Sequence, residues 1–356
     1  MPLVAHNELP AFKDLHEEGQ IVLSQERAKK QDIRALHVGL LNMMPDAALV
    51  STERQFFRLI GASNPIAQFR VHPFALAEQK RGESAQKHID SYYETFDEIK
   101  VAGLDALIIT GANVTHSSLS EEAFWEPLLE VSKWAHENVT STLCSCLATH
   151  AILEARHGLA RHNMGYKRWG VYPHKVVDKT HPLVSDINTR FDVPHSRYNN
   201  ISKERFEEAG LKVLVSDDEG SVHLAVSADG IRTVYFQGHP EYDTISLLKE
   251  YKREVIRFQH GLRKDYPPFP ANYFSITSCA VFDEYEERLR QSMSANMSAP
   301  VFPELIVSPY IDNTWHDSGL AVIGNWMGLV YQITNSDLKL PFMSGVDPDA
   351  PLLYLE

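Results

Sequence analysis

The sequence predicts an α/β fold in which helices cover both faces of a mostly parallel sheet. From residue 34 onward, short apolar segments alternate with amphipathic helical segments, which is the pattern of repeated strand–helix units. The apolar segments mostly lack a polar face, as expected of strands that are buried on both sides. Four of them end at Asn42, Gly111, Cys146 and His239. Because ligands bind at the carboxyl ends of parallel strands, we expect the functional site to lie where these four residues meet.

The elements of the first half follow from the apolar periodicity. Residues 1–33 are polar, and we expect them to form a strap with one helical piece near 12–18. We predict strands at 36–42, 66–73, 106–111 and 140–145, and helices at 51–61, 83–100, 121–138 and from the last strand to about 157.

The second half changes its pattern. Strands at 211–216 and 222–227 flank an acidic turn, so we expect an antiparallel pair that leads into a strand at 233–238. Helices are predicted at 244–259 and 283–294, and the apolar segment 315–331 should dock on the main domain. The chain is thereby divided into a strap (1–33), a main domain (34–274), an insertion (275–311) and a C-terminal segment (312–356).

The composition is that of an ordinary globular protein. The 356 residues are 44% hydrophobic and 23% charged, with a net charge of −13. This charge disfavours a nucleic-acid partner, because phosphate recognition needs a dense basic patch. No apolar run of about eighteen residues and no secretion signal can be read, so we expect a cytoplasmic protein without membrane contact. Three cysteines do not indicate a disulfide framework.

Cys146 stands at the turn between a predicted strand and the helix after it. A thiol at a helix N-terminus is close to unpaired N–H groups and to the positive end of the dipole, which favour the thiolate. About ninety residues later, another strand ends at His239, and Glu241 follows two positions on. A nucleophile, a base and an acid that orients the base are the parts of covalent acyl transfer.

These residues also have alternative structural and metal-binding roles. Cys144 is expected to be a packed strand residue, which would also be the ordinary role of an isolated Cys146. Cys144, Cys146 and His150 could ligate a metal, but no second ligand pair completes a tetrahedral site. We therefore predict that the site holds no metal.

Several long motifs resemble the homoserine O-acyltransferases of methionine biosynthesis, which have a class I glutamine-amidotransferase-like, flavodoxin-like scaffold. The resemblance runs from Met1 to about Thr334 apart from 275–311. It rests on Asn42-Met43-Met44-Pro45, Thr52-Glu53-Arg54-Gln55, Ile109-Thr110-Gly111-Ala112, Val139-Thr140-Ser141-Thr142-Leu143, Lys167-Arg168-Trp169-Gly170-Val171-Tyr172, Pro194-His195-Ser196-Arg197-Tyr198, Gly238-His239-Pro240-Glu241-Tyr242-Asp243 and Asn325-Trp326.

The resemblance implies roles for individual residues. Cys146 matches the acylated nucleophile, His239 the general base and Glu241 the acid that orients it. Arg253 matches the arginine that holds the carboxylate of the amino acid, and the remaining matches line the substrate pocket or form the oxyanion hole with backbone N–H groups. The pocket residues are Lys167 and Ser196, and the oxyanion donors are Leu147 and Met43.

Two departures from the family pattern concern the acyl donor. Asp46-Ala47 stands where the family commonly has two lysines, which puts a lysine role in donor binding in doubt. Thr115 stands where succinyl-specific members tend to have glycine and acetyl-specific members have glutamate. A glutamate would repel the free carboxylate of a succinyl group, whereas Thr115 is uncharged and can donate a hydrogen bond to it.

The resemblance therefore implies a homoserine O-succinyltransferase that uses succinyl-CoA and L-homoserine in a ping-pong reaction. Acyl-CoA is a substrate, so no cofactor is expected, and we expect a homodimer. Acetyl-CoA as the donor and serine as the acceptor stay open. Two further alternatives are a glutaminase subunit of an amidotransferase and a catalytically inactive binding protein, but an intact triad argues against the latter.

Overall fold

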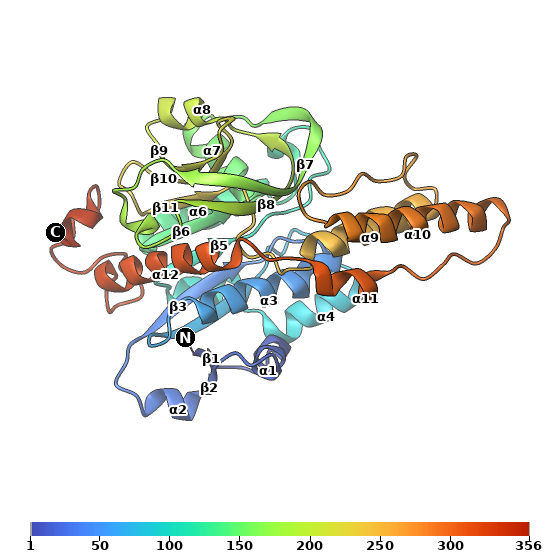
Figure 1. Cartoon of the computed structure of the whole chain (residues 1–356). Helices are drawn as coiled ribbons and strands as arrows, with labels where there is room; N and C mark the ends of the chain where they lie inside the picture. Colours follow the sequence, from blue (N-terminus) through green and yellow to red (C-terminus); the bar gives the residue numbers. More distant parts are fainter. Residues whose placement is uncertain (1, 356) are drawn as a thin grey trace.

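The computed structural model describes residues 2–355 and is built around an eleven-stranded sheet (Figure 1). The strand order is β2-β1-β4-β3-β5-β6-β11-β10-β9-β7-β8. Pairing is parallel from β2 to β11 and antiparallel from β11 to β8. The strands are β1 (Leu3–Ala5), β2 (Val22–Ser24), β3 (Ala35–Leu41), β4 (Gln68–Phe74), β5 (Ala106–Ile109), β6 (Ser141–Ser145), β7 (His162–Val176), β8 (Arg190–Asn200), β9 (Lys212–Ser216), β10 (Val222–Val226) and β11 (Thr233–Phe236).

Helices pack on both faces of this sheet. The α-helices are α1 (Pro10–Glu17), α2 (Gln25–Lys29), α3 (Asp46–Ala62), α4 (Glu83–Tyr92), α5 (Phe96–Ala102), α6 (Trp125–Asn138), α7 (Leu147–His157), α8 (Lys203–Glu208), α9 (Ser246–Gln259), α10 (Ile276–Ser294), α11 (Glu304–Val307) and α12 (His316–Ile333). Short 3-10 helices lie at Leu119–Glu121, Pro182–Val184, Ser308–Tyr310 and Pro351–Leu355.

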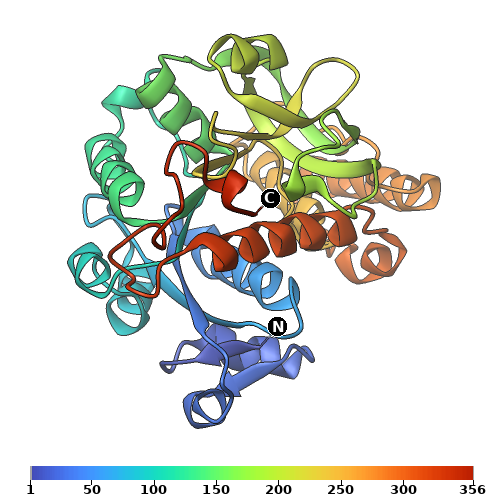
Figure 2. The ribbon, with the colours of Figure 1, turned by 90° about the vertical axis from the view of Figure 1, so that its left-hand side faces the viewer.

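Two apolar layers hold the helices to the sheet. Phe57 of α3 and Trp326 of α12 belong to one buried cluster, and Figure 2 shows α12 running across that face. Leu128 of α6 and Ile152 of α7 belong to a second cluster on the opposite face. The predicted three-layer fold with a mostly parallel sheet is therefore confirmed. No helix within residues 2–355 is both long and apolar enough to cross a membrane.

Two segments differ from the predicted elements. The strap contributes β1 and β2, which extend the parallel part of the sheet at its edge. The predicted helix 83–100 is divided into α4 and α5, because Thr95 caps α5 in a capping box with Glu98. The Glu94 N–H between them donates to the Pro73 carbonyl at 2.9 Å, which ties this break to the end of β4.

The long antiparallel ribbon β7–β8 is absent from the sequence-based assignment. Much of β7 is exposed and carries charged residues, so it lacks the apolar alternation by which strands are recognised. At Gly170 of this ribbon, φ is 140° and a Cβ atom would lie 2.2 Å from the Ala271 carbonyl oxygen. Only glycine fits there, and the contact brings the chain after α9 against the ribbon.

Residues 275–311 extend from one end of the sheet in Figure 1. Phe282 and Leu289 of α10 are buried against Tyr251 of α9 and Trp169 of β7 in a third apolar cluster. This cluster joins the segment to the two elements, β7 and α9, that carry predicted substrate-binding residues.

Candidate active site

Cys146 lies in a strained turn between β6 and α7. Its φ of 52° and ψ of −109° are unfavourable for a residue with a side chain, and such strain persists where the surroundings impose it. The Cys146 N–H donates to the Phe236 carbonyl of β11 at 2.8 Å. The Thr149 hydroxyl supports the turn, because its oxygen lies 2.8 Å from the carbonyl oxygens of both Cys144 and Phe236 and its one proton is shared between them. Cys144 is fully buried and packs within the strand, as predicted from the sequence.

His239 and Glu241 follow the neighbouring strand β11 and form a buried pair. His239 Nδ1 lies 2.7 Å from Glu241 Oε1, and the His239 ring stacks on Tyr242. Burial alone would lower the pKa of His239, but the charges of Glu241 and Cys146 raise it well above 6.5. His239 Nε2 is buried and has no hydrogen-bond partner among residues 2–355. The second ring nitrogen of His239 thus adjoins the cysteine, whose charge contributes to the raised pKa.

Glu250 of α9 is a residue that sequence reasoning missed. Its Oε2 accepts hydrogen bonds from Ser196 Oγ at 2.7 Å and Lys167 Nζ at 3.0 Å. Its Oε1 accepts one from the Tyr242 hydroxyl at 2.8 Å. Burial opposes its ionisation, but Lys167 and these hydrogen bonds hold the pKa of Glu250 below its usual value. The sequence could have indicated Glu250 through its spacing from Arg253. The two residues are three positions apart, which places both on one face of α9.

Most of the predicted site residues line one cavity of about 1330 Å³. The structure brings Cys146, Leu147, Thr115, Lys167, Ser196 and Arg253 to its wall. His239 and Glu241 lie beneath the surface next to the cysteine and do not line the cavity. Lys167 is held over the Trp169 ring at 4.2 Å, and burial lowers its pKa. Residues from the β6–α7 turn, β7, β8 and α9 therefore converge at the C-terminal edge of the parallel strands.

This chain is similar to known proteins along nearly its whole length. Residues 2–336 match the family described as homoserine O-succinyltransferase. A homoserine O-succinyltransferase of Thioalkalivibrio nitratireducens and one of Allochromatium vinosum are each 60% identical over 352 residues, covering 99% of both chains. The chain belongs to this family. It is therefore an acyltransferase, and the resemblance noted in the sequence is confirmed.

Among solved structures, a glutamine amidotransferase from Thermotoga maritima is similar at a TM-score of 0.46 and 9% identity. The match covers 83% of this chain and 97% of that protein.

The two predicted oxyanion donors differ in their surroundings. Leu147 is the first residue of α7, so its N–H has no partner within the helix. The Met43 N–H instead donates to the Thr110 hydroxyl at 2.9 Å, and Met43 is fully buried. Gly111 follows Thr110, and a Cβ atom there would lie 3.6 Å from Cys146 Cβ and 3.8 Å from the Leu147 nitrogen. In this family member, the N–H of Met43 is thus already engaged, whereas the backbone of Gly111 adjoins the cysteine.

Thr115 lies in the exposed loop after β5, where it faces both the main cavity and a neighbouring pocket that Met43 lines. Its hydroxyl donates to Glu122 Oε2 at 3.1 Å, and its N–H donates to Glu122 Oε1. Burial favours the neutral form of Glu122, but hydrogen bonds from His116 and Thr115 hold its pKa below the usual value. Sequence reasoning missed this carboxylate, which already accepts a hydrogen bond from the hydroxyl that was expected to bind the acyl donor.

Asp46, at the start of α3, takes the position of the first family lysine. Its Oδ2 accepts a hydrogen bond from the Gly82 N–H at 2.7 Å, and its Oδ1 lies 3.4 Å from Arg81 Nη1. Arg81 also donates to the carbonyl of Met44, so the two charges fix the loop before α3. The local charge balance thus differs from that of two lysines.

Arg161 lines the cavity without an ionic partner. Among residues 2–355, no hydrogen bond or salt bridge to its guanidinium is found, although it is half-buried. Burial lowers its pKa, against the charges of Glu154, Glu122 and Cys146. An arginine keeps its charge under such conditions, so the cavity contains a cation that faces the cysteine region and is free to bind an anion.

Proposed function

We propose that this acyltransferase moves a succinyl group from succinyl-CoA to the hydroxyl of L-homoserine through a thioester on Cys146. The proposal is carried by the strained Cys146 turn beside the hydrogen-bonded pair of His239 and Glu241. Family membership supports the donor and the acceptor, because the relatives bear the name homoserine O-succinyltransferase.

In the first half-reaction, the Cys146 proton resides on His239 Nε2, because the raised pKa of His239 favours the thiolate and imidazolium pair, and the thiolate Sγ attacks the thioester carbonyl of the acyl-CoA. The carbonyl oxygen becomes an oxyanion, which the N–H groups of Leu147 and Gly111 would stabilise. The bond to the CoA sulfur then breaks, and His239 returns the proton to that sulfur. One thioester replaces another at nearly level free energy, which suits a cysteine nucleophile.

In the second half-reaction, His239 takes the proton of the homoserine hydroxyl, and the oxygen attacks the thioester carbonyl. The Cys146 thiolate leaves and regains the proton, and the product is an oxygen ester. Glu241 holds the imidazole so that Nε2 faces the reacting atoms and stabilises the imidazolium that forms in each step. A single covalent intermediate between two substrates gives ping-pong kinetics.

Homoserine carries an ammonium group and a carboxylate, so its binding site needs an anionic side chain for the first and a cationic side chain for the second. Glu250 is ionised and lies directly behind Ser196 and Lys167, which line the cavity, so we assign it to the substrate ammonium. Arg253 is 56% exposed on the cavity side of the same helix, and we assign it to the carboxylate. Lys167 and Ser196 then act by holding the Glu250 carboxylate in place, which refines their predicted role in the pocket.

The charge of the cavity bears on the donor. A succinyl-CoA carries a free carboxylate near the reacting carbonyl and phosphates far from it, and acetyl-CoA carries only the phosphates. Arg161 is a free cation that can bind either group. Thr115 offers no negative charge of its own, which is compatible with the succinyl carboxylate, although Glu122 stands behind it.

Intact-mass measurement tests the proposal. Purified protein is incubated with succinyl-CoA or acetyl-CoA in the absence of an amino acid, and the mass of the chain is read. We expect one succinyl adduct that disappears when L-homoserine is added. An acetyl adduct alone would identify the enzyme as an acetyltransferase. If L-serine removed the adduct and L-homoserine did not, the acceptor would be serine. We further propose a cytoplasmic homodimer, for which light scattering should give twice the chain mass.

A further inference from the structure

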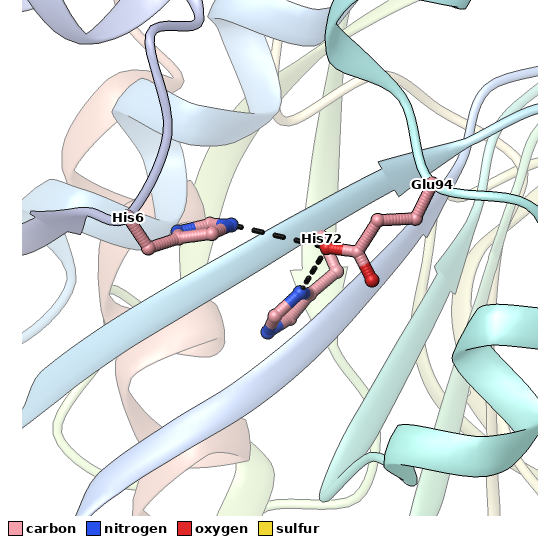
Figure 3. Close-up of side chains that lie close together, drawn as sticks. All are labelled: His6, His72 and Glu94. Atoms are coloured by element: carbon pink, nitrogen blue, oxygen red, sulfur yellow. Dashed lines mark hydrogen bonds and ion pairs between the residues drawn. The ribbon is translucent and has the colours of Figure 1, made fainter.

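A cluster of three side chains lies near one edge of the sheet, outside the site around Cys146. It consists of His6, His72 and Glu94. His6 follows β1, His72 belongs to β4, and Glu94 lies between α4 and α5 (Figure 3). One potential ligand atom of each residue lies within 4.8 Å of the others, and among residues 2–355 this is the sole group of this kind. The three side chains point toward one another from three separate segments.

The tautomer of His6 leaves a lone pair inside this cluster. His6 Nδ1 lies 3.2 Å from the Val4 carbonyl oxygen, which can only accept, so Nδ1 carries the proton. Nε2 of the neutral ring is therefore an acceptor. It is buried, has no hydrogen-bond partner, and faces Glu94 Oε1 at 4.0 Å. Two acceptors thus face each other with no proton between them, which is unfavourable unless a cation or a donor lies there.

The other two residues are held in position. His72 Nδ1 lies 2.6 Å from Glu94 Oε1, and His72 Nε2 lies 3.0 Å from His37 Nδ1. The Glu94 backbone is bound to the end of β4 through its N–H. The His6 side chain is nine-tenths buried, whereas that of Glu94 is 27% exposed, so an ion could enter from the carboxylate side.

We propose that His6, His72 and Glu94 bind a zinc ion that fastens the N-terminal segment to the sheet. Two imidazoles and a carboxylate are ligands that zinc prefers, and a water molecule at the exposed side would complete a tetrahedron. The second shell also suits a metal, because His6 donates its other ring N–H to a carbonyl and His72 is bonded to His37.

Binding requires a change of tautomer and small shifts of the side chains, because ligand atoms on a tetrahedral zinc ion lie about 3.3 Å apart. The 2.6 Å contact between His72 and Glu94 must widen, and the 4.0 Å separation between His6 and Glu94 must close. The proton on His72 Nδ1 moves to Nε2, from which it is donated to His37 Nδ1, and the His37 proton moves to its own Nε2. The metal then takes the place of the proton between His72 and Glu94.

The consequence concerns the attachment of the first residues. β1 has three residues and pairs with β4 at a single position, Leu3 with Phe69. A bond from His6 through the metal to His72 would link the two segments more firmly than this pairing. The zinc should therefore stabilise the folded protein rather than take part in the reaction.

Zinc titration of the full-length Cys146→Ala protein tests the inference, because this background removes the catalytic thiol as a competing ligand. Chelator-treated protein is dialysed against zinc chloride, and bound zinc and the melting temperature are measured. We expect one zinc per chain and a melting temperature raised by several degrees. Cobalt in place of zinc should give the visible absorption of a tetrahedral site.

Variants locate the ion. His6→Gln and Glu94→Gln should each weaken zinc binding by at least about tenfold. His16→Gln changes an exposed histidine of α1 in the same segment and should bind zinc as the parent does. Absence of retained zinc, or equal retention by His6→Gln and Glu94→Gln, would overturn the assignment. Glu94→Gln keeps the size of the side chain, so it decides the outcome even where His6→Gln folds poorly.

Discussion

The hydroxyl of Thr115 donates its proton to the carboxylate of Glu122 at 3.1 Å. The position that resembles the donor-selecting site of the family therefore has a negatively charged residue, Glu122, directly behind it. Donor selectivity can depend on the side chain at residue 115 or on the conformation of the loop that Glu122 holds. Substitutions distinguish these two causes.

Thr115→Glu should lower kcat/KM for succinyl-CoA relative to acetyl-CoA by about tenfold or more, because a carboxylate would face that of the donor. The measurement is kcat/KM for each donor. In the single variant, the new charge also opposes Glu122 and could distort the loop. The double variant Thr115→Glu with Glu122→Gln relieves this repulsion, and the shift in donor ratio should persist in it. A ratio that returns to the parent value would mean that the loop, and not the charge at residue 115, selects the donor.

Cys146→Ala should reduce turnover by at least about a thousandfold and abolish the acyl adduct, because no other thiol lies in the strained turn. Cys144→Ala is the matched control two residues away. It removes a buried atom from β6 and should cost about 1 kcal/mol of stability while leaving substantial activity. An adduct on the Cys146→Ala protein would place the acylated residue elsewhere.

Glu250→Gln should raise KM for homoserine by about 10–100-fold, since a hydrogen bond to a charged group contributes about 1.5–3 kcal/mol. KM for succinyl-CoA should change little, because the donor does not use the ammonium site. Steady-state kinetics with each substrate varied in turn give both values. The control is Glu304→Gln in α11. It removes an ion pair with Lys252 of α9, the helix that also carries Glu250, and should leave both values unchanged. An effect of Glu250→Gln on the donor alone would refute the ammonium role.

Glu250 also illustrates what the sequence could not provide. The strand ends that carry Cys146 and His239 were predictable, because buried strands have local apolar patterns and their ends meet in a parallel sheet. The hydrogen bonds of Glu250 depend on the ribbon β7–β8, which brings Lys167 and Ser196 to α9 from more than fifty residues away. That ribbon has no alternating pattern, so its path had to come from the structure.

The oxyanion hole shows a similar limit. A loop at the end of β3 was expected to offer the Met43 N–H, and the loop indeed lies near the site. Thr110 follows the neighbouring strand β5, and its hydroxyl oxygen accepts a hydrogen bond from that N–H, a contact between residues 67 positions apart. Hydrogen bonds of this kind are set by tertiary packing, which motif spacing does not encode.

Buried His150 should make the protein sensitive to acid. Burial lowers its pKa to about 3, and its Nε2 lies 2.9 Å from Gln237 Oε1. The pKa is about 6.5 in the unfolded chain, so the unfolded state binds a proton first as the pH falls. The stability contributed by neutral His150 is complete above pH 6.5 and is lost at about 1.4 kcal/mol per pH unit down to about pH 3.

Urea denaturation at pH 7, 6 and 5 checks this sign. His150→Gln should be less stable at pH 7 but should lose less stability between pH 6 and 5, by about 1 kcal/mol. The exposed His16→Gln variant should follow the parent at every pH. A steeper loss in His150→Gln than in the parent would contradict a neutral buried histidine.

Arg161→Gln should weaken the binding of the acyl donor. This arginine is a half-buried cation that lines the cavity, and residues 2–355 provide no ionic partner for it. Loss of one charge-assisted contact should raise KM for succinyl-CoA by about tenfold or more. Comparison of the two donors then identifies the group that it binds. If Arg161 holds the succinyl carboxylate, acetyl-CoA is unaffected, and if it holds a phosphate, both donors weaken equally. Arg288→Gln, which changes an exposed arginine on α10, should alter neither. Unchanged KM values for both donors in Arg161→Gln would show that this cation has no part in donor binding.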